Sequence, residues 1–295
     1  MGMYLNALAI LFRRTFLLLF FGLLMLVVCF VNYYNPIFTI ISGLNSIGDS
    51  DIFSNIISFL QMLLNFTAEP SMLPGEVLAL AVLLVVLSIA AGLLFSGYFY
   101  ILNNTLDGKP KYRGEFLAGL KKYFFKLTFI SFRVFLLGFM LAIFLMVALV
   151  PAIIVTKTWM AGRPQLLFPA ILLDILTVAV LLFGLMLFRV YMFFWYPACY
   201  NTGKKAFITG KRVADSHFWN TVVSVLMFDI VLAGFQAIKA YIGKTTALKN
   251  VETHFPVPGL LIINWAFYTF YFASLTVYIF SLFKAYAAQD AYFAK

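Results

Sequence analysis

Four ionisable residues interrupt the long apolar stretches of this chain and are the first candidates for chemistry: Arg133, Asp174, Arg189 and Asp229. A charge inside a bilayer costs about 2.5–3.5 kcal/mol on insertion scales, so each one needs a partner or a function. Arg133 and Asp229 are predicted at similar depth, in the inner half of two outward-running spans. Three interpretations are open: an ion pair that joins two helices, a site for a substrate or a proton, or no contact.

The other two charges have different surroundings. Arg189 is predicted near the cytoplasmic end of its span, where its long side chain reaches the lipid headgroups. Asp174 is predicted in the outer half of the membrane, where Gln236 and Asn264 can approach it from neighbouring spans. Such a polar cluster either joins helices through hydrogen bonds worth about 0.6 kcal/mol each or lines an outward-open cavity.

The chain contains none of the motifs that commonly mark catalysis or metal binding. Gly-x-Ser-x-Gly, His-Glu-x-x-His and the lysine-containing phosphate loop are absent. His217 and His254 are the only histidines, and Cys29 and Cys199 are predicted at opposite membrane faces. No metal site and no disulfide is therefore expected. We predict a protein without enzymatic activity, cofactor or metal.

Six apolar stretches must position these residues. The chain is 64% hydrophobic and 11% charged, and a membrane helix needs about 20 mostly apolar residues. The predicted spans are residues 16–33, 77–102, 127–150, 166–191, 218–238 and 259–283. In lipid every backbone amide must pair within its own segment, so these spans are expected to be helices. The predicted fold is an all-α polytopic membrane protein with a single domain over residues 1–295.

Lys and Arg are distributed unequally between the two ends of these spans. Fourteen lie on the side that holds both termini, and five lie on the other side. Because basic residues resist translocation, the richer side and both termini are predicted to be cytoplasmic. The net charge of +10 then faces anionic headgroups, so membrane lipids are the expected partners, with a protein partner as an alternative. Nucleic acid is not expected, because the bases flank spans and form no soluble basic domain.

Several shorter segments are amphipathic. In residues 51–66 apolar and polar side chains occupy opposite helical faces, which predicts a helix in the outer interface or a binding lid. Residues 8–20, 117–129 and 207–222 each begin with a basic, amphipathic segment and run into an outward span. One interpretation is three helical hairpins with cytoplasmic amphipathic elbows. The other is chance similarity in a chain rich in Phe and Leu.

Two stretches of the chain resemble a known group of membrane proteins. The first stretch is Gly97-Tyr98-Phe99-Tyr100-Ile101, then Asp107-Gly108-Lys109, then residues 116–124. The second is Tyr196-Pro197, then residues 203–211, then Phe218-Trp219. Both resemble poorly characterised six-span bacterial membrane proteins related to the membrane domain fused to some glycerophosphodiester phosphodiesterases. The resemblance implies the six-span topology and a bacterial inner-membrane location. This chain lacks the fused catalytic domain with its acidic and histidine residues. The resemblance therefore implies no activity.

Two functions from different classes fit these observations. The first is a non-catalytic multi-pass membrane protein that serves as a subunit, scaffold or helper in an envelope or transport process. It follows from the missing catalytic motifs, the small loops and the basic elbows. The second is a small-solute or lipid transporter that uses the buried charges on spans three to five. The two differ in whether Arg133, Asp174 and Asp229 line a water-accessible cavity.

Overall fold

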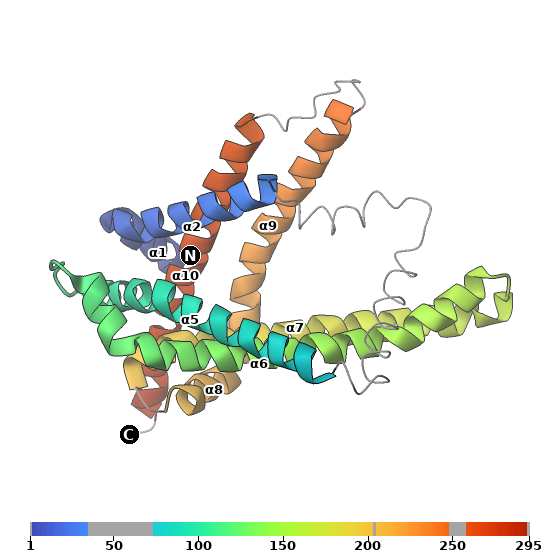
Figure 1. Cartoon of the computed structure of the whole chain (residues 1–295), viewed down its shortest axis with the longest axis horizontal. Coiled ribbons are helices and arrows are strands. Elements are labelled where there is room, and N and C mark those ends of the chain that lie inside the picture. The colour runs from blue at the N-terminus through green and yellow to red at the C-terminus, as the bar shows by residue number, and fades with distance from the viewer. Residues whose placement is uncertain (1, 35–72, 203–204, 248–257, 294–295) are drawn as a thin grey trace. The chain divides into compact units, whose positions relative to one another are not determined.

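The computed structural model describes residues 2–34, 73–202, 205–247 and 258–293; 94% of these residues are helical, and none of them forms a strand. The helices are α1 (Gly2–Arg13), α2 (Thr15–Tyr34), α5 (Leu73–Leu106), α6 (Glu115–Met160), η1 (Pro164–Leu166), α7 (Leu167–Thr202), α8 (Ala206–Ser216), α9 (Phe218–Ala247) and α10 (Pro258–Phe293) (Figure 1). The predicted all-α fold is confirmed. The helix predicted over residues 51–66 lies outside the described residues.

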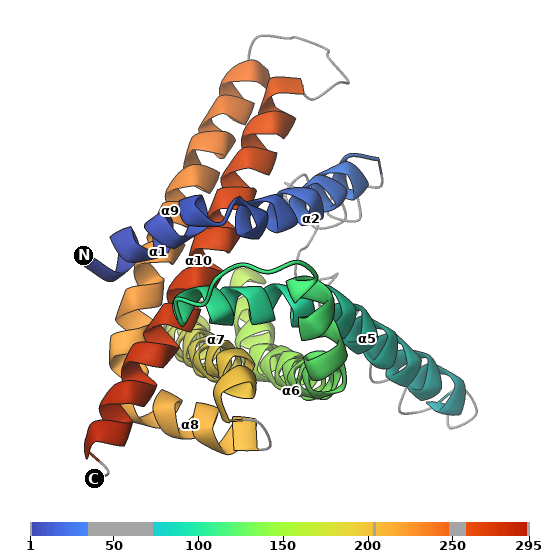
Figure 2. The same ribbon diagram turned by 90° about the vertical axis from the view of Figure 1, so that its left-hand side faces the viewer.

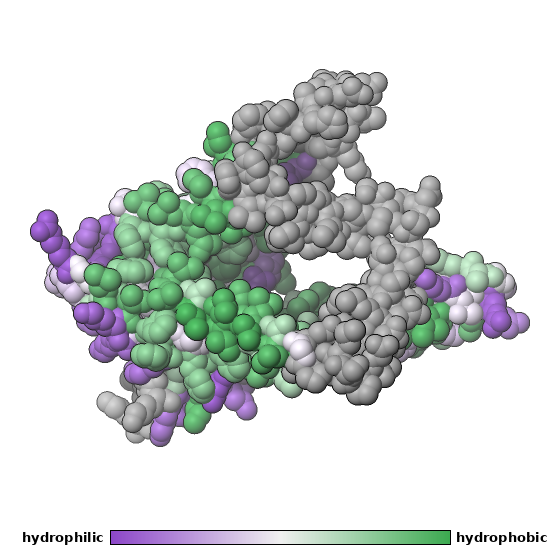
Figure 3. All heavy atoms as spheres, in the orientation of Figure 1, coloured by the Kyte–Doolittle hydropathy of each residue, from purple (hydrophilic) through white to green (hydrophobic). Residues whose placement is uncertain are grey.

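Five of these helices are long and apolar enough to cross a membrane, and the count becomes six when the bent pair α1–α2 is taken as one span. The five segments are Leu78–Leu106, Glu115–Met160, Pro164–Asn201, Phe218–Lys239 and Leu261–Gln289. At about 1.5 Å per residue, the longest of them exceed the roughly 30 Å hydrocarbon core of a bilayer. The chain is therefore a membrane protein by the length and composition of its helices. Hydrophobic side chains cover much of the visible face of the described residues (Figure 3).

The predicted amphipathic elbows take two forms. The first and third are separate short helices, α1 and α8, which precede α2 and α9 respectively. The segment that begins at Leu117 is instead the first part of the continuous helix α6. It contains no Pro or Gly that ends the helix before the apolar stretch begins, and the only Pro of α6 is Pro151.

The helices fall into two compact units. The first contains Met1–Ile37, Ser96–Lys121 and Phe193–Lys295, and the second contains Phe38–Phe95 and Lys122–Met192. Helices α5, α6 and α7 each contribute one end to the first unit and the remainder to the second. That the chain folds as a single domain stays a prediction.

Aromatic side chains form the core of the first unit around α10. The fully buried Tyr98 stacks on Phe20 with ring centroids 4.6 Å apart, and it meets the edge of Phe21 at 5.2 Å. Phe280 of α10 packs against Phe99 at 4.9 Å. In α10, 61% of the most apolar stretch is buried, against 11% in α9 of the same unit. Helix α10 is thus the central helix of this unit, with α2 and α9 beside it (Figure 2).

Two glycines allow the end of α5 and the start of α6 to pack closely. A Cβ atom at Gly97 would lie 2.4 Å from the ring of Phe116, and one at Gly119 would lie 2.5 Å from Cβ of Tyr100. Both distances are shorter than real carbon contacts, so neither position has room for a side chain. This close packing holds the end of α5 against the start of α6.

Candidate functional site

The chain turns sharply between α1 and α2, and Arg14 lies at the turn. The axes of the two helices meet at 90°. The N–H of Arg14 donates to the carbonyl of Ile10 and so completes α1, while its own carbonyl accepts a hydrogen bond from the N–H of Leu17. Arg13 remains exposed, whereas the Arg14 side chain is only 11% exposed.

Arg14 forms a buried ion pair with Glu115, the first residue of α6. Its Nη1 lies 2.9 Å from Oε2 of Glu115, whose side chain is 4% exposed. The side-chain amide of Asn104, at the end of α5, donates to the other carboxylate oxygen at 2.9 Å. Arg14 Nη2 also donates to the carbonyl oxygen of Lys109 at 2.7 Å. One carboxylate therefore joins the α1–α2 turn, the end of α5 and the start of α6.

The loop that carries Lys109 begins and ends at glycines with positive φ. Gly108 has a φ of +71° and Gly114 a φ of +80°. Both values lie in the left-handed region, where a side chain is disfavoured. The second of these turns leads directly into α6 and places Glu115 opposite Asn104.

Lys284 connects α10 to the same end of α5. Its ammonium donates to the carbonyl oxygen of Asn103 at 2.9 Å and to Oδ1 of Asp107 at 2.5 Å. Nζ of Lys109 lies 3.3 Å from Oδ2 of Asp107. Partial burial raises the pKa of Asp107, but the hydrogen bonds and charges of Lys284 and Lys109 outweigh it and hold that pKa below its usual value. The carboxylate is therefore charged at neutral pH.

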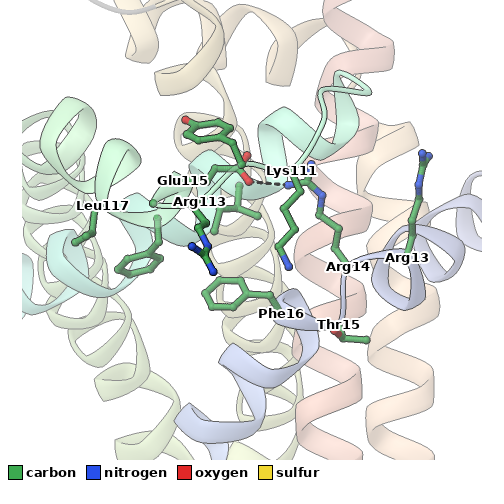
Figure 4. Close-up of a pocket in the computed structure, with 12 residues that line it drawn as sticks. Arg13, Arg14, Thr15, Phe16, Lys111, Arg113, Glu115 and Leu117 are labelled. Atoms are coloured by element: carbon green, nitrogen blue, oxygen red, sulfur yellow. Dashed lines mark hydrogen bonds and ion pairs between the residues drawn. The ribbon is translucent and has the colours of Figure 1, made fainter.

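An open pocket of about 410 Å³ lies beside the Arg14–Glu115 pair (Figure 4). We call it the basic pocket. Its charged lining consists of Arg13, Arg14, Lys111, Arg113 and Glu115, and its apolar lining includes Phe16, Ile101, Phe116 and Leu117. All of these residues belong to the first unit. The pocket therefore combines a surplus of positive charge with a hydrophobic wall.

The side chains of the basic pocket point in different directions (Figure 4). Arg14 turns toward Glu115, and Lys111 and Arg113 extend toward Phe16. Arg13 points away from them. Lys111 and Arg113 are both exposed, so their charges are available to a ligand that enters the space above Phe16.

This arrangement is suited to binding an anion. Both oxygens of Glu115 accept hydrogen bonds within the protein, so this carboxylate is committed to a structural role. Within the described parts of the chain no group of three or more His, Cys, Asp or Glu side chains lies close enough to hold a metal ion. Exposed bases beside an apolar wall match the chemistry of a phosphate-bearing amphiphile.

The structure gives Asp174 a partner within the second unit. The hydroxyl of Thr156, near the end of α6, lies 3.1 Å from both carboxylate oxygens and donates to this group. Thr156 is buried, whereas Asp174 is exposed. The residue pair thus links α6 to α7 across the turn that joins them. Gln236 and Asn264, the predicted neighbours of Asp174, belong to the first unit, so that cluster stays a prediction.

Gln236 and Asn264 have separate environments within the first unit. The side-chain amide of Gln236 donates to the hydroxyl of Tyr268 on α10 and so joins α9 to α10. Oδ1 of Asn264 is buried and has no hydrogen-bond partner among the described residues. No hydrogen bond joins these two side chains to each other within the described parts of the chain.

The remaining predicted site residues lie in both units. Arg133 of α6 is exposed, and its guanidinium lies 4.3 Å from the ring centroid of Phe129, in the second unit. Arg189 of α7 is half-buried in that unit, and Asp229 of α9 is half-buried in the first. The ion pair between Arg133 and Asp229 stays a prediction.

Sequence reasoning did not identify the Arg14–Glu115–Asn104 cluster. A signal for it exists, because Glu115 and Asp107 are the only acids in the strongly basic region between residues 103 and 126. An acid in such a region is a natural partner for one of the bases. The base that pairs with Glu115 depends on the tertiary structure, because Arg14 is 101 positions away in the sequence and lies at the bend between α1 and α2.

Comparison with known proteins gives no family model, no curated protein and no solved structure that matches the chain.

Proposed function

We propose that the protein is a non-catalytic multi-pass protein of a bacterial cell membrane, with both termini cytoplasmic, that serves as a subunit, scaffold or helper in an envelope or transport process. Its basic end, by which we mean the α1–α2 turn and the α5–α6 loop with Arg13, Lys109, Lys111 and Arg113, is the part that engages the membrane surface or a partner. The observation that carries this proposal is the basic pocket, where bases from two distant segments gather beside a buried ion pair.

Two features of that end support the proposal. The paired charged groups there hold helices together: Glu115, which is buried, pairs with Arg14, and Asp107 pairs with Lys284. The bases that remain on the surface, among them Lys111 and Arg113, are free to face anionic headgroups. Each such base contributes about 1 kcal/mol of attraction near an anionic leaflet.

Orientation is tested with an impermeant maleimide on intact cells. The starting variant carries Cys29→Ser and Cys199→Ala, and single cysteines are then introduced as Lys111→Cys or Arg163→Cys. These positions lie in the α5–α6 loop and in the turn between α6 and α7, and both are exposed. We expect the Arg163→Cys variant to be labelled and the Lys111→Cys variant to remain unlabelled. Labelling of Lys111→Cys alone would overturn the proposed orientation.

The role as a subunit is tested by native mass spectrometry of the protein after gentle extraction from its own membrane. A second polypeptide in fixed stoichiometry is expected, and its identity would name the process. A protein that is always alone and that retains a specific solute would contradict the subunit role.

A transporter is the second candidate, because Asp229 is half-buried in a membrane segment and Asp174 is exposed in another. If these carboxylates line a pathway, Asp229→Asn abolishes uptake while the amount of folded protein is unchanged. If Asp229 instead pairs with Arg133, Asp229→Asn destabilises the protein and a neutral substitution at Arg133 restores its stability. The second result would reject the transport site.

A further inference from the structure

The basic pocket has the charge distribution of an anion site. Four of its side chains are basic and one is acidic, and Glu115 is neutralised by Arg14 within the protein. Lys111 and Arg113 are left exposed and extend toward Phe16, whereas the exposed Arg13 points away from them. The first turn of α6 lines the same pocket, and its backbone N–H groups add positive potential because they lack carbonyl partners within the helix.

The opposite wall of the pocket is apolar. The rings of Phe16 and Phe116 meet edge to face with centroids 6.1 Å apart. Phe16 remains 38% exposed and Leu117 remains 59% exposed, so both present hydrophobic surface beside the charges. Phe16 is in the first turn of α2, and Leu117 is in the first turn of α6. The charged and apolar walls thus meet where two apolar helices begin.

A ligand that satisfies both walls carries a compact negative group and a hydrocarbon chain. Free phosphate would satisfy the bases but leave the aromatic wall exposed, and a neutral lipid would leave the bases without a counter-charge. An anionic phospholipid satisfies both, and the anionic leaflet is where the proposed orientation places this end of the chain.

We propose that the basic pocket is a binding site for one anionic phospholipid, with its phosphate between Lys111 and Arg113 and its acyl chains along Phe16 and Leu117. This inference rests on the proposed function, because it requires the basic end to face the leaflet that carries anionic lipid. It adds a specific site and a ligand class to a general attraction between charges.

The inference is tested by native mass spectrometry of the full chain in detergent, titrated with phosphatidylglycerol or with phosphatidylcholine. One phosphatidylglycerol is expected to bind at least tenfold more tightly than phosphatidylcholine. The double variant Lys111→Gln/Arg113→Gln should weaken phosphatidylglycerol binding about 25-fold, since each base near the surface is worth about fivefold in affinity. The variant Lys111→Arg/Arg113→Lys should restore it.

The matched control is Lys211→Gln/Arg212→Gln, which removes one Lys and one Arg at exposed positions of α8, outside the pocket. Its affinity should stay within twofold of the original. If the control and the pocket variant weaken binding equally, the attraction is diffuse: the pocket site is overturned, but the proposed role of the basic end stands. If the original protein does not prefer phosphatidylglycerol, both the site and the role of this end fail.

A third arm separates a lipid from a free anion. Inorganic phosphate at millimolar concentration is added to the complex with phosphatidylglycerol. Retention of the lipid is expected, because the apolar wall holds only the lipid. Displacement by phosphate alone would show that the pocket binds free anions and would overturn the assignment to a phospholipid. Thermal unfolding of each variant confirms that changes in affinity do not result from loss of the fold.

Discussion

Replacing Glu115 with Gln should destabilise the protein substantially, because this carboxylate joins three segments. Glu115 is 4% exposed and its partner Arg14 is 11% exposed, so the pair resembles a buried ion pair more than a surface one. Surface pairs contribute about 0–1 kcal/mol. Removing one partner of a buried pair costs about 3–5 kcal/mol, because the other charge is left without compensation.

The expected value lies at the lower end of the second range. Arg14 keeps its hydrogen bond to the carbonyl of Lys109, and the oxygen of the new Gln side chain can still accept from Asn104. We therefore expect Glu115→Gln to lower the free energy of unfolding by about 3 kcal/mol. At roughly 2–4 °C per kcal/mol, this corresponds to a fall in Tm of about 6–12 °C.

The assay is thermal unfolding of the purified protein in detergent, followed by the fluorescence of its four tryptophans. The control is Arg113→Gln, which removes one exposed charge from the preceding loop and should shift Tm by no more than about 1–2 °C. If Glu115→Gln and Arg113→Gln lower Tm equally, the ion pair does not stabilise the helix junction. A double-mutant cycle with Arg14→Met and Glu115→Leu gives a second check, because two side chains that do not interact would have additive effects.

Three further predictions concern other contacts of the first unit. In the folded protein the pKa of Asp107 is below its usual value of about 3.9, so the stabilising contribution of this carboxylate is complete above that pH and is lost as the pH falls through the folded pKa. Between pH 7 and pH 3, Tm should therefore fall more steeply for the original protein than for Asp107→Asn. Equal slopes would contradict the pairing of Asp107 with Lys284. Gly119→Ala should lower the free energy of unfolding by about 1–3 kcal/mol, because the new Cβ would lie 2.5 Å from Cβ of Tyr100. The control Gly234→Ala, where a new Cβ has no atom within 4 Å, should be neutral or stabilising by up to about 1 kcal/mol. Equal shifts in Tm would disprove the close approach of Gly119 to Tyr100. Trp265→Phe removes the indole N–H that donates to the carbonyl of Gly22 at 2.7 Å and should lower the free energy of unfolding by about 1 kcal/mol. The control Trp219→Phe changes an exposed side chain and should not change Tm measurably. A smaller effect at Trp265 than at Trp219 would count against the link between α10 and α2.

The helices themselves could be predicted from the sequence. Apolar runs of about 20 residues leave few alternatives, because an unpaired amide in lipid costs several kcal/mol. The span predicted over residues 16–33 corresponds closely to α2, and the one over 218–238 corresponds closely to the span Phe218–Lys239. The prediction was less informative where apolar and amphipathic helix join without a break, as in α6, since periodicity alone does not show where a continuous helix leaves the membrane.

The candidate site depended on tertiary structure. Arg133, Asp174 and Asp229 attract attention in the sequence because a charge in an apolar run is rare, and this signal is independent of the fold. Glu115 and Arg14 gave no such signal, because each is surrounded by ordinary loop and flanking charges. Their importance comes from the tertiary structure: Arg14 lies at the 90° turn after α1, and it pairs with Glu115 at exposed fractions of only 11% and 4%.

The sequence by itself therefore determined that this chain is a helical membrane protein and predicted which of its ends carries positive charge, because both properties follow from composition along short segments. Only the tertiary structure decided which charges are buried in pairs and which line a pocket. The physical reason is that pairing depends on distances between residues far apart in the chain, as Arg14 and Glu115 are, and no local pattern encodes those distances.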